Sequence, residues 1–279
     1  GAWGSHTGSF AVADVSVLAF DSSQVFRAGA VFTGTGLARF ESGITNFETG
    51  SSFNAQIALA GGTVNFQPGS GAGLQPDLAL TTGGSLNLST GSLVQLDSLT
   101  LASSSMGGAD QVKIKNSLVM NSGTLAGSGT LTIPATASAQ LTSAAIKNIS
   151  RPIVNQGVIS FNQGTVQMAG GQLNNSGDLR FEGDLLWNLG SVTNSGTIEK
   201  VGGSQMASLS PDSLTNTGTI LSNSGQLTLQ HLTNLNPGAR LLSGGTYRVD
   251  GTGKIRFNDI NNGLLRNLST LVIDGPNAQ

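Results

Sequence analysis

Leu-Asn-Asn-Ser-Gly, at residues 173–177, is one of five copies of a short phrase that decides the fold of this chain. The other copies are Ile-Val-Asn-Gln-Gly at 153–157, Val-Thr-Asn-Ser-Gly at 192–196, Leu-Thr-Asn-Thr-Gly at 214–218 and Leu-Thr-Asn-Leu-Asn-Pro-Gly at 232–238. Successive asparagines of the phrase are 20, 19, 22 and 18 residues apart, at Asn155, Asn175, Asn194, Asn216 and Asn234. A period near twenty residues is typical of a solenoid, in which each repeat forms one coil.

Apolar residues alternate with polar ones inside each period. Ile159 and Phe161 follow one glycine, and a second alternating run, such as Leu227-Thr228-Leu229, comes later in the coil. This pattern predicts strands with one buried face. Two or three short strands joined by tight turns use about twenty residues and leave no room for a helix. The sequence therefore predicts an all-β protein, a right-handed parallel β-helix of about thirteen coils with about 20 residues per coil.

The Asn-x-Gly corner suits such a coil. Glycine adopts positive φ without steric cost, and asparagine tolerates the left-handed region better than bulkier residues. Asparagines at equivalent corners of stacked coils can also hydrogen-bond amide to amide. A single Asn-x-Gly corner is more simply a surface turn, but five copies at one period favour a ladder of asparagines.

The repeat divides the chain, which we expect to be a single β-helix domain over 1–279, into four stretches. Residues 1–43 are the predicted N-terminal coils and cap, with Trp3 covering the open end of the solenoid. Residues 44–96 carry the variant spelling Asn-[Phe/Leu]-x-x-Gly-Ser, which returns at 234–239 and so looks interchangeable with the first spelling at one corner. Residues 97–152 are predicted as irregular coils, in which either a lateral loop, at 103–110 and 135–150, or a lost marker breaks the period. Regular coils resume over 153–279.

Composition excludes several classes of function. Charged residues are 10% of the chain, the net charge is −2 and the basic residues are scattered, so nucleic acid and anionic membranes are poor partners. The chain has no cysteine, and hence no disulfide or thiolate metal site. No apolar run is long enough for a transmembrane helix. The chain begins with glycine rather than Met and ends without an evident cap, which favours an excised fragment or a mature form.

The repeats resemble those of secreted bacterial β-helix proteins. The residues that carry the resemblance are Gly196-Thr197-Ile198-Glu199-Lys200 and the run from Leu214 to Leu229, which is similar to Asn-Ser-Gly-Thr-Ile and Ser-Gly-Thr-Leu-Thr-Leu repeats. Filamentous-haemagglutinin-type adhesins and autotransporter passenger domains contain repeats of this kind. The resemblance covers 153–241 well and 44–93 in part. It implies export to the bacterial surface, adhesion or display and a part in virulence, and it carries over no catalytic residue.

Candidate chemistry is sparse, and we expect no catalytic, cofactor-binding or metal-binding residue. His6 and His231 are the only histidines and have no acidic partners at ligand spacing, so His231 is predicted to be a corner residue. The one acidic constellation is Glu182-Gly183-Asp184, which alternation would place with Arg180 on the solvent side of one strand. Paired carboxylates there could serve glycoside or calcium-assisted lyase chemistry.

Two structural predictions compete with a catalytic function. Arg180 and Glu199 both lie three residues past their corner glycines, which predicts a surface ion pair between adjacent coils. Trp187 and Tyr247 are the only aromatic residues that could form an exposed sugar-binding platform, since the phenylalanines alternate as core residues do. The sequence gives little support for a threonine array that binds ice, because Thr130-Leu131-Thr132 and Thr215-Asn216-Thr217 do not recur at the same place in successive coils.

The sequence thus favours a non-enzymatic segment of an exported bacterial surface protein, a rigid β-helical rod for adhesion, display or assembly. Its expected location is extracellular, at the bacterial cell surface. Expected partners are a host or neighbouring-cell receptor, a glycan or another surface protein. Self-association of the chain is a further option, and we expect no direct insertion of this segment into a membrane. The alternative is a β-helix protein that binds or degrades polysaccharide.

Overall fold

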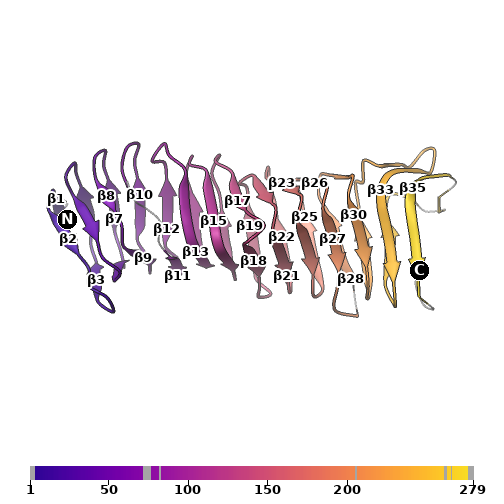
Figure 1. The fold of residues 1–279 in the computed structure, drawn as a ribbon, viewed down its shortest axis with the longest axis horizontal. Coiled ribbons are helices and arrows are strands. Elements are labelled where there is room, and N and C mark those ends of the chain that lie inside the picture. The colour runs from indigo at the N-terminus through magenta and orange to yellow at the C-terminus, as the bar shows by residue number, and fades with distance from the viewer. Residues whose placement is uncertain are drawn as a thin grey trace. The chain divides into compact units, whose positions relative to one another are not determined.

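The structure, a computed structural model, describes residues 4–71, 77–81, 83–204, 206–260, 263–264 and 266–275. The chain divides into two compact units, an N-terminal unit of residues 1–132 and a C-terminal unit of residues 133–279. Both are all-β, and the described residues form strands and no helix (Figure 1). Accordingly, none of the described residues belongs to a helix that could cross a membrane.

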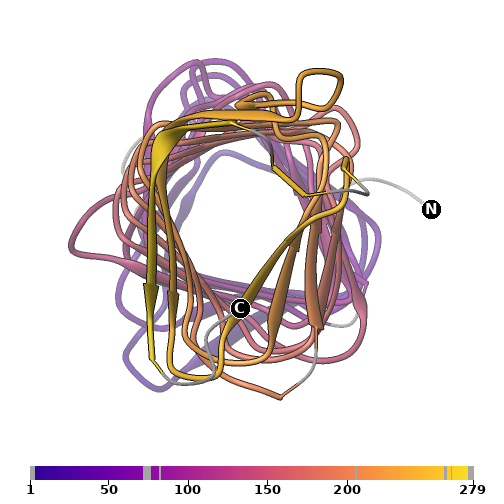
Figure 2. The ribbon, with the colours of Figure 1, turned by 90° about the vertical axis from the view of Figure 1, so that its right-hand side faces the viewer.

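Each coil contributes strands to up to three faces of the solenoid, and each strand pairs in parallel with its counterpart in the next coil. Figure 2 looks along the stacked coils, with the last coils of the C-terminal unit nearest the viewer. Counterparts on the first face lie about twenty residues apart: Ile44 pairs with Thr63, and Thr63 pairs with Ser85. The described chain supplies 13 first-face strands, one per coil, which confirms the predicted parallel solenoid of about thirteen coils.

In the N-terminal unit the strands fall into three sets. The first face consists of β1 (Gly4–His6), β4 (Gln24–Phe26), β7 (Ile44–Phe47), β10 (Thr63–Phe66), β12 (Ser85–Leu88), β14 (Ser104–Gly107) and β16 (Gly123–Leu125). The second face begins with β2 (Ser9–Ala11), β5 (Val31–Thr33) and β8 (Ser52–Phe53). The third set begins with β3 (Val17–Phe20), β6 (Leu37–Phe40), β9 (Gln56–Leu59) and β11 (Asp77–Thr81). The long strands β13 (Val94–Ala102) and β15 (Val112–Met120) continue it with their second halves, while their first halves belong to the second face, where β15 pairs with β17 (Leu131–Ile133).

The C-terminal unit repeats the plan. Its first face consists of β19 (Ile146–Ile149), β22 (Gly164–Gln167), β25 (Leu185–Asn188), β28 (Met206–Ser210), β31 (Gln226–Leu229) and β34 (Lys254–Phe257). Its second face consists of β20 (Ile153–Asn155), β23 (Gln172–Asn175), β26 (Ser191–Asn194) and β29 (Ser213–Asn216). Its third face consists of β18 (Ser138–Leu141), β21 (Val158–Phe161), β24 (Asp178–Phe181), β27 (Thr197–Lys200), β30 (Thr219–Ser222), β33 (Leu241–Asp250) and β35 (Arg266–Asp274). The short strand β32 (Leu235–Asn236) pairs antiparallel with β33.

The two cores are filled by columns of like side chains. In the N-terminal unit the columns are phenylalanine: Phe26, Phe47 and Phe66 stack on the first face with ring centroids 4.8 and 4.5 Å apart. In the C-terminal unit they are mostly aliphatic, and Leu179, Ile198 and Ile220 lie in register and fully buried on the third face. Because each coil buries its apolar side chains only against its neighbours, stability accumulates coil by coil.

A buried ladder of asparagines ends the second-face strands of the C-terminal unit. The side-chain amides of Asn155, Asn175 and Asn194 each donate to the side-chain carbonyl of the next asparagine, at 2.6, 2.7 and 2.7 Å, and Asn216 completes the ladder. All four side chains are buried. The predicted fifth member is different, because the amide of Asn234 donates to the backbone oxygens of Asn216 and Ser243 instead.

In the N-terminal unit the variant spelling belongs to another face, so the two spellings are not interchangeable there, whereas at 234–239 Leu232 pairs with Leu214 and the variant follows it at the corner of the first spelling. In the N-terminal unit, Asn46, Asn65 and Asn87 lie in register on the first face. Their amides also form a ladder, at 2.8 and 2.7 Å, but the side chains point outward and are half-buried. The sequence phrase therefore marks two kinds of ladder, one inside the corner and one on the surface.

The corner glycines of the buried ladder have a different cause from the one predicted. Positive φ is not found at Gly177, Gly196 or Gly218. No asparagine of the described chain has positive φ either. A Cβ on Gly196 would instead lie 2.2 Å from the backbone oxygen of Gly177. Glycine is required because the backbone of the preceding coil passes where a side chain would begin.

Two sequence predictions about irregular segments are wrong. Ser104–Gly107 forms β14, and β18 and β19 occupy much of 135–150, so these segments run within the coils rather than outside them. Of the two explanations for the broken period, the lost marker is correct for the N-terminal unit, where Ser104 pairs with Gly123. The predicted N-terminal coils contain β1 and β2, and Trp3, the predicted cover of the open end, lies outside the described residues.

Candidate functional site

The predicted ion pair between adjacent coils is present at the surface of the third face. Arg180 and Glu199 are register partners, and Arg180 Nε lies 3.9 Å from Glu199 Oε2. Arg180 is closer to Asp178, with 3.1 Å between Nη2 and Oδ2, and Glu199 Oε1 accepts from Asn223 Nδ2 at 2.5 Å. Half-exposed pairs of this kind contribute at most about 1 kcal/mol, which makes the cluster structural.

The acidic constellation does not form a pair of carboxylates on one strand. Strand β24 ends at Phe181, so Glu182 and Asp184 both lie in the following turn, and the prediction that they share a strand with Arg180 is wrong. Asp184 instead faces the buried side chain of Lys200. Burial lowers the pKa of Lys200, and the opposite charge of Asp184 raises it. The Lys200 ammonium donates to the backbone oxygens of Gly183, at 3.1 Å, and of Gly202.

Both histidines are tied to neighbouring coils. His6 forms a hydrogen bond of 2.8 Å between Nε2 and Gln24 Oε1, and its ring stacks on Phe26. His231 has φ of 54° and lies 2.6 Å from the oxygen of Pro211 through Nδ1, which confirms it as a corner residue. Among the described residues, no group of three or more His, Asp or Glu side chains could hold a metal ion.

Neither candidate aromatic platform is exposed. Trp187 is 1% exposed, and its indole packs edge-on against Phe161 with ring centroids 5.3 Å apart. Tyr247 is fully buried, and burial raises its pKa to about 12, an effect that the neighbouring Asn216 side chain partly offsets. The expectation that these residues could stack on a sugar is therefore wrong, and both belong to the core.

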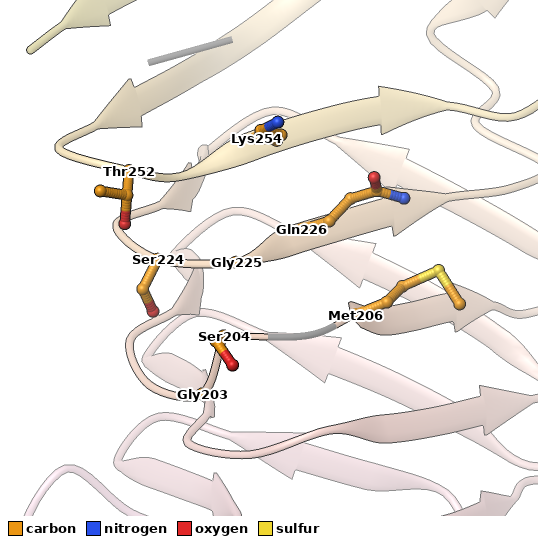
Figure 3. Close-up of a pocket in the computed structure, with 8 residues that line it drawn as sticks. All are labelled: Gly203, Ser204, Met206, Ser224, Gly225, Gln226, Thr252 and Lys254. Carbon is orange, nitrogen blue, oxygen red and sulfur yellow. The ribbon is translucent and has the colours of Figure 1, made fainter. Parts of the chain in front are cut away.

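A groove of about 720 Å³ opens on the C-terminal unit where the third face turns into the first (Figure 3). Three successive coils line it, with Gly203, Ser204, Met206, Ser224, Gly225, Gln226, Thr252 and Lys254. One row holds the hydroxyls of the turns, and the other holds the outward side chains at the starts of β28, β31 and β34. The groove is thus a repeated surface that an extended ligand can follow from coil to coil.

The polar groups of this groove are placed for hydrogen bonding. Ser224 Oγ has no hydrogen-bond partner among the described residues. Gln226 Nε2 donates to Thr228 Oγ1 at 2.8 Å, which fixes the amide against β31. Met206 is 49% exposed and supplies the apolar part of the lining. Hydroxyl, amide and ammonium groups around a thioether can bind a polar ligand, and no carboxylate lines the groove.

A second, smaller depression of about 350 Å³ shares two residues with the groove. Gln226 and Lys254 line both, and Arg256 and Ile255 are among the other residues of the smaller one. Lys254 and Arg256 are both exposed and stand two positions apart on β34, hence on the same side of the strand. The two depressions therefore form one basic surface at the end of the first face.

The N-terminal unit has an open depression of its own, of about 570 Å³, beside the turn at residues 89–93. Its one carboxylate, Asp110, is buried and accepts hydrogen bonds from the backbone N–H groups of Thr90 and Gly91, at 2.7 and 2.9 Å, and from the Thr90 hydroxyl. Asp110 thus closes the turn of the preceding coil, and its hydrogen bonds are structural.

Sequence reasoning missed the groove. No motif marks Lys254 and Arg256, although Gly225-Gln226-Leu227 and Gly253-Lys254-Ile255 share the pattern of glycine, polar residue and aliphatic residue one coil apart. That alignment would have placed Gln226 and Lys254 side by side on the surface. Comparison of the chain with family models, curated proteins and solved structures found no match.

Proposed function

We propose that this chain is a non-enzymatic, rigid β-helical segment of an exported bacterial surface protein, and that it serves adhesion, display or assembly. The observation that carries the proposal is the groove on the C-terminal unit, which is lined by hydroxyl, amide and ammonium groups from three coils and by no carboxylate. Such a lining suits binding, while acid–base chemistry on a glycosidic bond needs two carboxyl groups at the site.

The architecture suits the same task. Core columns fix the backbone, so outward side chains can be arranged for a partner with little effect on stability. In-register rows present the same group once per coil, as the exposed asparagines of the N-terminal unit do. A partner with a repeating surface, such as a glycan or another surface protein, can then make several weak contacts at once.

The alternative is a protein that binds or degrades polysaccharide. The same groove favours its binding half, because hydroxyls and amides are the groups that recognise sugar hydroxyls. Degradation has less support, since Glu182 is exposed and Asp184 faces Lys200. The two hypotheses differ in the expected partner. The adhesive segment would bind a cell-surface receptor or glycan, and the alternative would bind a free polysaccharide.

Attachment to cells tests the proposal. Beads coated with the folded chain are expected to adhere to bacterial or animal cells more strongly than beads coated with the heat-unfolded chain, which has the same composition. Incubation of the soluble chain with polysaccharides should release no new reducing ends. Equal adhesion of folded and unfolded coats would contradict the adhesive function, and steady release of reducing ends would establish the degrading alternative.

A further inference from the structure

The charges around the groove are unevenly distributed. Lys254 and Arg256 stand exposed on β34, and neither forms an ion pair with a described residue. Among the described residues, no carboxylate lines the groove or the depression beside it. The basic surface is therefore uncompensated in a chain whose net charge is −2.

Two carboxylates around this surface, Asp184 and Asp259, have other partners. Asp184 lies beside Gly203 at one edge of the groove, where it faces the buried Lys200 ammonium. Asp259 Oδ2 accepts a hydrogen bond from the backbone N–H of Leu232 at 3.3 Å. Neither carboxylate forms an ion pair with Lys254 or Arg256, so both cations can attract an anion from solution.

We propose that this groove binds an acidic oligosaccharide, with Lys254 and Arg256 on its carboxylate or sulfate groups and Ser204, Ser224, Thr252 and Gln226 on its hydroxyls. The proposal rests on the adhesive function above and names the ligand class of the same site. The two rows of the lining run from coil to coil, so the sugar chain lies across the strands. Ser224 reaches it by turning its unpartnered hydroxyl into the groove.

The lining disfavours other ligands. A neutral sugar is usually held by an aromatic ring under its apolar face, and Trp187 and Tyr247 are both buried. Single-stranded nucleic acid needs several aromatic side chains on which successive bases stack, and the described lining of the two depressions holds one, Phe257, whose ring packs edge-on against Tyr247. Met206 provides a modest apolar contact, so affinity must come from charge-assisted hydrogen bonds and from hydroxyl recognition.

Calorimetric titration of the full chain tests this assignment. The probes are a galacturonic acid oligosaccharide, a galactose oligosaccharide of the same length and a thymidine oligonucleotide. We expect the acidic sugar to bind at least tenfold more tightly than the neutral one, with an affinity that falls as salt rises. The double variant Lys254→Gln/Arg256→Gln should lose about tenfold or more in affinity, because each change removes a charge-assisted hydrogen bond.

The matched control is Lys113→Gln, which removes a lysine charge from β15 of the N-terminal unit and should leave affinity unchanged. Equal binding of acidic and neutral sugars, equal loss in the control, or tighter binding of the oligonucleotide would each overturn the assignment. Cell attachment that the double variant retains in full would also overturn it while leaving the adhesive function intact. Binding of the acidic oligosaccharide without any attachment to cells would support the ligand assignment and contradict the adhesive function.

Discussion

The side-chain amide of Asn175 donates to the side-chain carbonyl of Asn194 across adjacent coils at 2.7 Å, with both side chains buried. Its nitrogen also lies 3.0 Å from the backbone oxygen of Thr197, which accepts a second hydrogen bond. Each asparagine therefore joins the next coil at two points, in a part of the corner that water does not reach. A buried polar group of this kind is expensive to leave without a partner.

Interrupting the ladder should destabilise the C-terminal unit. Asn194→Ala leaves the Asn175 amide and the Asn216 carbonyl without their side-chain partner, which should lower the free energy of unfolding by about 2–4 kcal/mol. Asn65→Ala interrupts the half-buried surface ladder, where water can replace the lost bonds, and should cost under about 1 kcal/mol. Denaturant titration of both variants measures the difference, and equal losses would show that burial of the ladder does not matter.

Substitution of a corner glycine tests whether glycine is required by close approach of the neighbouring coil or by its backbone conformation. Gly196→Ala places a Cβ 2.2 Å from the oxygen of Gly177, and the coils must separate to admit it, at a cost of about 1–3 kcal/mol. Gly8→Ala is the control, because its Cβ meets nothing within 4 Å and its φ is not positive. It should change stability by less than about 0.5 kcal/mol. Thermal unfolding that gives the same midpoint for both variants would refute the steric explanation.

A charge inside a core column should open the coil around it. Ile198 is fully buried between Leu179 and Ile220, so Ile198→Asp places an uncompensated charge there and should cost about 3–5 kcal/mol. Thr193→Asp puts the same charge on the exposed side of β26 and should be nearly silent. Limited proteolysis reads out the opening as new cleavage near residue 198. Identical fragment patterns for wild type and Ile198→Asp would contradict the buried column.

Tyr247 gives a spectroscopic test of the core, because it is the only tyrosine of the chain. Burial raises its pKa to about 12, so ultraviolet absorbance should show ionisation near pH 12 in the folded protein and near 10 in denaturant. Between these values the unfolded chain has lost the proton and the folded chain retains it. This group therefore lowers stability as pH rises from 10 to 12. A folded-state transition near 10 would mean that the hydroxyl reaches water.

Much of the architecture could be predicted from spacing alone. Period, alternation and corner phrases predicted parallel coils, the stacking of Asn175 on Asn194 and the pairing of Arg180 with Glu199, because side-chain direction and register follow from the repeat. The site could not be predicted in this way. Lys254 lies beside Gln226, and Gln226 beside Met206, although the first pair is 28 residues apart and the second pair 20. The longer coil between Gln226 and Lys254 carries no sequence motif from which its extra length could be predicted.

The sequence by itself determined that this chain coils, since a repeated pattern of apolar residues and glycines can bury its strands only against copies of itself. Tertiary structure alone decided what each repeated residue does. Repeated asparagines lie inside a corner at Asn194 and at the half-buried surface at Asn65, and the corner glycine is needed because the backbone of the preceding coil passes beside it. These roles depend on distances between coils, which sequence spacing does not contain.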